Sequence, residues 1–172
     1  MDSKKRMMFI LEEDYYFITI KLLAIFKALE CYKKPFSDYR KLGLIFEFIK
    51  DDRNMKLFRK LIKQDELDIF ENEKAVKLFC DSKMDVSIIK RVLFFLEKQE
   101  IVSLQKNIKS GNIDVMMLHN EKTEEIFMDD SIKKDVDAAL ELKKNIRGLK
   151  VLKIETLQTK ILGYSEVTKW ED

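Results

Sequence analysis

The chain is short of the residues that make tight turns. Its 172 residues include 4 glycines and 1 proline, whereas average usage would give about twenty in this length. Glycine and proline supply the backbone conformations of turns and interrupt helices. The deficit therefore disfavours an all-β sandwich or barrel, a low-complexity chain and any fold built on glycine-rich phosphate loops. It favours long helices joined by short polar connections.

Histidine is equally scarce. His119 is the only histidine, so a Ser-His or Cys-His catalytic pair would have to use it, and no nucleophile stands beside it in the sequence. No cluster of histidine and cysteine has zinc-ligand spacing, and neither phosphate-loop motif, GxxxxGKS/T or GxGxxG, is present. We therefore predict that the chain is not an enzyme, with no catalytic residue, no metal, no cofactor and no small-molecule substrate.

The two cysteines and the hydropathy pattern indicate that the protein is cytoplasmic. Cys31 and Cys80 both lie within apolar helical patterns, which predicts two buried thiols in a reducing cytosol. A disulfide between them is the open alternative. No uncharged run approaches the roughly 20 residues that a membrane span requires. We expect a cytoplasmic protein without a membrane partner.

What the chain does contain is a helical pattern of apolar residues. Apolar residues make up 46% of the chain and charged residues 37%, enough for a folded core. Apolar side chains recur at helical spacing. The first such segment is apolar on most sides, which predicts a central helix, and Asp85 is the expected N-cap of a later one. The expected helices span residues 14–33, 38–50, 53–64, 65–82, 86–99, 131–146 and 149–162.

Between the fifth and sixth of these helices the period changes. The β-rich runs 101–107 and 112–119 flank a turn containing Gly111, which is typical of a hairpin. Helix, turn, helix and hairpin is the order of a winged helix. The predicted fold class is mainly α with one β-hairpin, a winged-helix-like core with additional N- and C-terminal helices. We expect one compact unit made of an N-terminal helical arm (1–37), the core (38–119), and a C-terminal helical hairpin and tail (120–172).

The candidate nucleic-acid contacts lie on the expected helix 86–99, which would be the third helix of the winged helix, and on the hairpin that follows it. In DNA-binding winged helices the third helix enters the major groove. Residues 83–110 hold six basic and three acidic residues, and the side chains that could reach phosphates are Lys90, Arg91, Lys98, Lys106 and Lys109. The helix face offers no Asn, and its one Gln stands at the end, whereas base readout uses Arg, Asn or Gln. We favour a solvated face used for protein contacts and keep DNA contact as the alternative.

Two adjacent blocks of opposite charge follow the hairpin. Residues 121–141 hold eight acidic and three basic residues, and residues 143–160 hold six basic and one acidic. The blocks either pair with each other across a helical hairpin or leave a basic surface that docks an acidic partner or nucleic acid. Both readings stay open, because individual surface ion pairs are weak. The candidate partner contacts of the basic block are Lys143, Lys144, Arg147 and Lys150.

Two pairs of adjacent apolar residues point to a partner surface. Phe94-Phe95 and Met116-Met117 cannot each turn both side chains toward the same core, so one member of each pair is expected to be exposed. Exposed apolar patches often mark partner surfaces, where methionine and aromatic residues are enriched. We take Phe94, Phe95, Met116 and Met117 as candidate partner contacts.

Three stretches of the sequence resemble a known family. They are Tyr39-Arg40-Lys41-Leu42-Gly43-Leu44-Ile45-Phe46-Glu47-Phe48-Ile49, the helix and hairpin from Val86 to Leu118, and Leu152-Lys153-Ile154-Glu155-Thr156-Leu157. Their order resembles the small middle-component subunits of bacterial ABC-three-component antiphage systems, including the small accessory subunit of Lamassu. The resemblance implies a non-catalytic subunit that binds an SMC-like ATPase and a nuclease-type effector, with nucleic acid nearby in the complex. The alternative is a stand-alone winged-helix DNA-binding transcription regulator.

Overall fold

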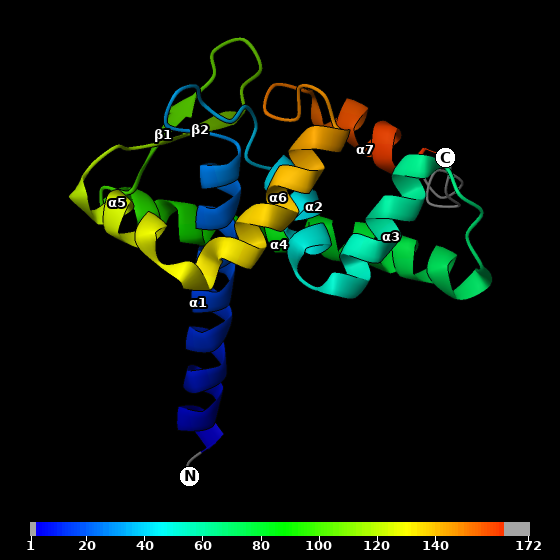
Figure 1. Ribbon diagram of the computed structural model, residues 1–172. Helices are drawn as coiled ribbons and strands as arrows, with labels where there is room; N and C mark the ends of the chain where they lie inside the picture. The colour runs from blue at the N-terminus through cyan, green and yellow to red at the C-terminus, as the bar shows by residue number, and fades with distance from the viewer. Residues whose placement is uncertain (1–2, 164–172) are drawn as a thin grey trace.

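The computed structural model of the chain describes residues 3–163, with side chains from residue 14 onward. Within this range the fold is mainly α with one antiparallel hairpin, which confirms the predicted class at that level (Figure 1). In chain order the elements are α1 (Ser3–Ala28), α2 (Lys41–Ile49), α3 (Asp52–Lys63), α4 (Ile69–Lys98), β1 (Val102–Lys106), β2 (Ile113–Met117), α5 (Glu121–Met128), the 3-10 turn η1 (Asp130–Ile132), α6 (Lys133–Asn145) and α7 (Ile154–Leu162).

Two helices run through the core: the second half of α1, within the segment 14–33 that was expected to be central, and α2. Every residue of α2 is buried, and the helix contacts α1, α3, α4 and α6. Apolar side chains surround its axis, and its two charged residues find partners inside the fold. Lys41 donates to the carbonyl groups of Leu149 and Lys150, and Glu47 pairs with Lys50. Buried charges are tolerated only when they are paired in this way.

The first helix is longer at its start and shorter at its end than the sequence predicts. Its N-terminal half extends away from the rest of the chain (Figure 1). Its second half enters the core from Ile18 onward. It ends at Ala28, because the chain then turns through Glu30, whose φ is 52°. A left-handed residue of this kind terminates a helix.

The two helices predicted for 65–82 and 86–99 are one helix, α4. Its N-cap is Asp68, whose side chain accepts from the backbone N–H of Glu71 in a capping box. Asp85 lies inside this helix, so its prediction as an N-cap was wrong. Residues 82–85 contain no glycine or proline, and the packing of α2 against this stretch outweighs the modest helix-breaking tendency of Ser and Asp.

Gly43 allows the close packing of α2 on α4. A Cβ atom built on Gly43 would lie 2.3 Å from the carbonyl oxygen of Ser82. Only glycine fits at this approach, because any side chain would meet the backbone of α4. The contact lies beside residues 82–85 of α4, where the sequence predicted a break between two helices.

The hairpin has the predicted position. Its register pairs Val102 with Met117 and Lys106 with Ile113. An isolated bridge joins Phe36 to Val115 through two hydrogen bonds of 2.7 and 2.9 Å, and so fastens the segment before α2 to the hairpin. The order α2, α3, α4 and hairpin follows the expected winged-helix order. The winged-helix identity itself stays a prediction.

The C-terminal region holds one helix more than expected. Asn120 and Thr123 form a capping box that starts α5 in a segment whose acidic composition hid the helix. The last helix begins at Ile154 rather than at 149, because the chain first turns at Gly148, whose φ is 75°. The predicted tail at 164–172 lies outside the described residues.

The two cysteines differ from each other. Cys31 is buried as predicted, whereas Cys80 is exposed on α4, and both thiols are free. The prediction of a buried Cys80 and the alternative of a disulfide were therefore wrong. Cys80 belongs to an apolar sequence pattern, but it lies on the side of α4 that faces away from α2. Along residues 3–163 we find no helix with both the length and the hydropathy needed to cross a bilayer.

Candidate functional site

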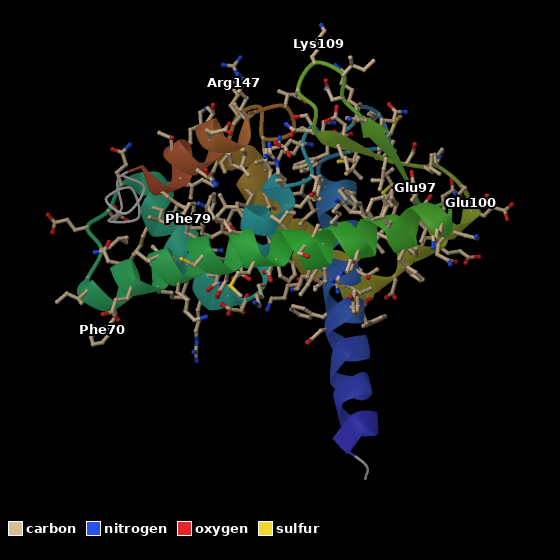
Figure 2. The ribbon with its side chains drawn as sticks, turned by 180° about the vertical axis from the view of Figure 1, so that it is seen from behind. Phe70, Phe79, Glu97, Glu100, Lys109 and Arg147 are labelled. Atoms are coloured by element: carbon tan, nitrogen blue, oxygen red, sulfur yellow. The ribbon has the colours of Figure 1, made fainter. Side chains whose placement is uncertain are left out.

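The longest exposed surface of one element is the outer face of α4 (Figure 2). From residue 83 to residue 98 the exposed positions are four basic residues, four apolar residues and one serine: Lys83, Lys90, Arg91, Lys98, Met84, Ile88, Phe94, Phe95 and Ser87. We call this set the α4 face. The opposite side of the helix is in the core through Ile89, Val92, Leu93 and Leu96.

The apolar members of the α4 face are large and well exposed. Met84 is 73% exposed and Phe95 is 57% exposed. Phe94 is also exposed, although the Lys90 ammonium lies 5.9 Å from its ring centroid. The sequence predicted that one of these two phenylalanines would be exposed. In the structure both of them face solvent. The core is filled instead by the residues that flank the pair on either side.

The methionine pair behaves as expected, with one member in the core. Met117 is 1% exposed and belongs to the hydrophobic core, so its assignment as a partner contact was wrong. Met116 is half-buried on the other face of β2. Side chains alternate along a strand, and the residue opposite Met117 is the buried Val102.

The predicted nucleic-acid contacts lie in two places. Lys90, Arg91 and Lys98 are exposed on α4. Lys106 and Lys109 are exposed on the hairpin, with Lys109 at its tip and above the line of α4 (Figure 2). The structure therefore groups the first three on one surface and sets the hairpin pair apart.

The basic block at 143–160 is partly used inside the fold. The Lys143 ammonium donates to the Ala28 carbonyl oxygen and to the Glu30 carboxylate, and Lys150 donates to the Glu30 carbonyl oxygen. Both residues therefore fasten the C-terminal region to the end of α1. Lys144 and Arg147 remain exposed. These contacts leave a smaller basic surface than the sequence indicates.

The acidic block is also paired with other elements. Asp135 accepts from Lys21 of α1 at 2.6 Å, and Glu141 accepts from Arg59 of α3 at 2.6 Å. Pairing of the two blocks with each other was one of the two readings left open, and these acidic residues instead form ion pairs to α1 and α3. The physical reason is that α6 packs along α1, which places its acidic side chains beside the cations of those helices.

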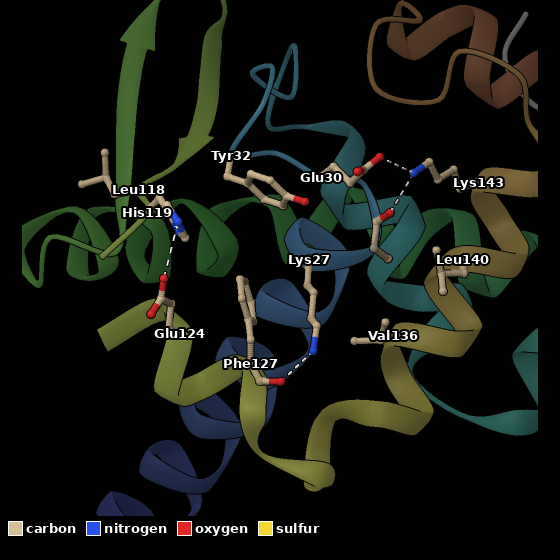
Figure 3. Close-up of a pocket in the computed structure, with 11 residues that line it drawn as sticks. Lys27, Glu30, Tyr32, Leu118, His119, Glu124, Phe127, Val136, Leu140 and Lys143 are labelled. Carbon is tan, nitrogen blue, oxygen red and sulfur yellow. Dashed lines mark hydrogen bonds and ion pairs between the residues drawn. The ribbon is translucent and has the colours of Figure 1, made fainter. Parts of the chain in front are cut away.

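A pocket of about 490 Å³ lies between the end of α1, the end of β2, α5 and α6 (Figure 3). Ala28, Leu118, Phe127, Val136 and Leu140 supply apolar wall. Its polar groups have neighbours: Lys27 donates to the Phe127 carbonyl oxygen at 2.6 Å, and Nε2 of His119 lies 3.4 Å from a carboxylate oxygen of Glu124. None of its eleven lining residues is a serine, threonine or cysteine that His119 could activate.

Glu30 at the edge of this pocket is held as a carboxylate. Hydrogen bonds from Lys33 and Lys143 lower its pKa to about 2. Because two cations neutralise it, Glu30 acts as an anchor for the turn after α1 and for α6. The lining charges thus satisfy one another, and the pocket presents apolar wall more than unmatched charge.

Two buried polar centres escaped the sequence analysis. One is Lys41, whose ammonium lies 4.5 Å from the centroid of the Phe36 ring, and burial lowers its pKa to about 8. The other is Glu47, whose pKa burial raises to about 7, with a hydrogen bond to the neighbouring Asp85 acting in the same direction. The available signal was a charged residue at each end of an otherwise apolar helix.

Nothing in these centres forms a metal site. Among the side chains that the structure describes, residues 14–163, no three His, Cys, Asp or Glu gather in the way that would hold a metal ion. The chain matches no protein-family model, no curated protein and no solved structure with which it was compared. The α4 face combines exposed apolar and basic side chains along one helix.

Proposed function

We propose that this chain is a non-catalytic accessory subunit, which acts in the cytoplasm as part of a larger protein assembly. The assembly is the one that the sequence resemblance implies, an SMC-like ATPase with a nuclease-type effector in a bacterial antiphage system. Nucleic acid would then be close to the subunit within the complex. The proposal concerns binding between proteins, and it assigns no reaction to the chain.

The observation that carries the proposal is the apolar part of the α4 face. Met84, Ile88 and Phe95 are exposed on the outer side of α4. Scattered apolar residues are normal on a protein surface, but a row of large side chains along one helix is typical of a binding surface. Burying such a row contributes about 25 cal/mol for each Å² removed from water.

The shape of α1 agrees with a subunit. Its first half extends away from the rest of the chain (Figure 1), and the sequence of that half contains the apolar run 7–11. Helices of about a dozen residues gain most of their stability in proteins from tertiary packing. A partner that packs against this half would stabilise it.

The test is co-expression with an SMC-like ATPase and a nuclease-type effector encoded beside the gene for this chain. The chain is expected to co-elute with the ATPase in size-exclusion chromatography. The double variant Ile88→Glu, Phe95→Glu is expected to lose co-elution, because it places charge within the contact. The matched control is Ile108→Glu, since Ile108 is 97% exposed on the hairpin and lies outside the α4 face.

Two results would contradict the proposal. One is a wild-type chain that elutes alone in the presence of both neighbouring proteins. The other is a complex that forms equally well with the double variant, which would remove the α4 face from the contact. Circular dichroism of each variant establishes that the helices are retained.

The runner-up is the stand-alone winged-helix regulator, favoured by the cations Lys90 and Arg91 on the exposed side of α4. It predicts selective binding to duplex DNA that falls when both are replaced by Glu. Phe95 weakens this alternative, because the major groove offers little apolar surface beyond thymine methyl groups to cover its exposed ring. Unchanged DNA binding by the double variant would exclude α4 as the reader.

A further inference from the structure

The exposed side of α4 contains a seam with the spacing of a coiled coil. Met84, Ile88, Arg91, Phe95 and Lys98 follow one another at intervals of four, three, four and three residues. Residues with this spacing line one side of a helix and are the positions that contact a second helix in a coiled coil. All five are exposed, so the rest of the described chain leaves this seam uncovered.

The seam carries positive charge and no exposed negative charge. Between residues 83 and 98 the two acidic residues are Asp85 and Glu97, and neither is exposed. Asp85 faces Glu47 of α2, and Glu97 accepts a hydrogen bond from the backbone N–H of Leu104 at 2.9 Å. Both acids are used within the fold, while Lys90, Arg91 and Lys98 face outward.

A second copy of the chain does not fit this seam. Two α4 helices packed in parallel and in register would set Arg91 against Arg91. An antiparallel pair centred on the seam would do the same, because Arg91 is its middle residue. Like charges at adjacent seam positions are destabilising, and charged seam residues select a partner of opposite charge.

We propose that the α4 face binds an acidic amphipathic helix of a partner protein. The apolar row of that helix packs on Met84, Ile88 and Phe95, and its Asp or Glu side chains lie opposite Arg91 and Lys98. The inference rests on the proposed function, because it specifies the chemistry of the partner that an accessory subunit would recognise. Arg91 and Lys98 set the orientation and the selectivity, and the apolar row supplies most of the affinity.

The seam also explains why α4 favours protein over nucleic acid. A duplex would bring phosphates near Arg91 and Lys98, but it would leave Ile88 and Phe95 without an apolar surface to cover them. An amphipathic helix satisfies both kinds of side chain at once. Helix-in-groove and helix-on-helix recognition both use anchors at this spacing.

The probe for the experiment is a synthetic, fluorescently labelled helical peptide of three heptads. It carries Leu at the positions facing the apolar row and Glu both in the seam and on its flank. A second peptide has Gln in place of every Glu, and a third has Lys. Binding of each to the full-length chain is measured by fluorescence anisotropy at low and moderate salt.

The Glu peptide is expected to bind, and the Gln peptide about tenfold more weakly, with the Lys peptide weakest. Raising the salt concentration is expected to reduce the difference between the Glu and Gln peptides, because exposed charges are screened. The variant Arg91→Glu, Lys98→Glu is expected to reverse the preference toward the Lys peptide. The matched control is Lys106→Glu, Lys109→Glu, which changes the same charge on the hairpin.

Equal binding of the Glu and Gln peptides, or absence of binding by all three, would overturn the inference. So would duplex DNA that binds the wild-type chain and displaces the Glu peptide, because the seam would then be a nucleic-acid surface. The co-expression experiment separates the two proposals. If Ile88→Glu, Phe95→Glu disrupts the complex while Arg91→Glu, Lys98→Glu does not, the subunit function stands and the acidic helix is wrong.

Discussion

The carboxyl group of Glu47 on α2 forms a hydrogen bond with that of Asp85 on α4 in the buried interface between the two helices. Oxygen Oδ2 of Asp85 is buried and receives no hydrogen bond from an amine, amide or hydroxyl group. A proton on Glu47 supplies a donor for this pair of acids, which burial would otherwise destabilise. Lys50 lies 2.9 Å from Glu47 and balances part of the remaining charge.

The Glu47–Asp85 pair predicts a pH dependence of stability. The folded chain holds a proton on Glu47 up to about pH 7, whereas the unfolded chain releases it above an ordinary pKa of 4.5. The free energy of unfolding therefore falls as the pH rises from 4.5 to 7, by about 3 kcal/mol at most. Denaturant unfolding of the wild type and of Glu47→Gln at pH 5 and pH 7.5 measures this fall in the free energy of unfolding.

The Glu47→Gln variant is expected to flatten this part of the profile, because glutamine does not titrate. The control is Glu125→Gln on the exposed side of α5, which should track the wild type. An unchanged slope in Glu47→Gln would show that the buried pair does not hold the proton.

Lys41 predicts a second pH dependence of stability, in which the free energy of unfolding rises with pH instead of falling. Its ammonium donates to the carbonyl oxygens of Leu149 and Lys150, each at 3.0 Å. Lys41→Met removes the ammonium donor to the Leu149 carbonyl oxygen, whereas the Lys150 carbonyl oxygen keeps its hydrogen bonds from Ser37. The substitution is expected to cost about 1–3 kcal/mol at pH 7. Burial lowers the pKa of Lys41 to about 8, so the folded chain loses this proton before the unfolded chain does.

The stability of the wild type is therefore expected to rise above pH 8 relative to Lys41→Met. Unfolding measured at pH 7, 8 and 9 tests the sign. The range stops at pH 9, because the pKa of Cys31 is raised from 9.0 to about 12 by burial, which lowers stability as the pH rises further. A difference between wild type and variant that shrinks with pH would refute the assignment.

The contact between Gly43 and Ser82 predicts an unusual effect of alanine. At an exposed helical glycine, alanine stabilises by about 1 kcal/mol. At Gly43 the added Cβ meets the Ser82 carbonyl oxygen at 2.3 Å, so α2 and α4 must separate. We expect Gly43→Ala to destabilise the chain by about 1–3 kcal/mol in thermal or denaturant unfolding.

A matched control for this variant is Gly111→Asn. Gly111 has a φ of 71° with open space around its Cβ position, and asparagine tolerates that conformation. The control is expected to change stability by a few tenths of a kcal/mol. A stabilising Gly43→Ala would mean that the two helices do not approach as closely as the structure places them.

The two cysteines predict a simple reactivity pattern. Cys80 is exposed on α4, whereas Cys31 is fully buried. Ellman's reagent at pH 8 is expected to modify one thiol in the native chain and two in guanidinium. Cys80→Ser should abolish the native reaction and leave the reaction in denaturant, since burial raises the pKa of the Cys31 thiol. Two fast thiols in the native chain would contradict the burial of Cys31.

Part of the candidate site was readable in the sequence, and part was not. Phe94 and Phe95 stood out because adjacent residues of a helix cannot both face one core. Their joint exposure could not be read, because it depends on how Leu93 and Leu96 fill the space beneath α4. Met117 was misassigned for the same reason, since Val102 across the hairpin and the core decide which face of β2 is covered.

The sequence by itself determined the helical class, the hairpin around Gly111 and the approximate positions of most helices. These follow from local periodicity and from the few residues that interrupt a helix. Only the tertiary structure decided that residues 69–98 form one helix. The packing of α2 against Ser82 is a contact between segments far apart in the chain, and local periodicity does not report it. It also decided where the charges go: Asp135 and Lys143 meet Lys21 and Glu30 because α6 packs along α1. Periodicity specifies which face of an element is apolar, and packing specifies which faces remain for a partner.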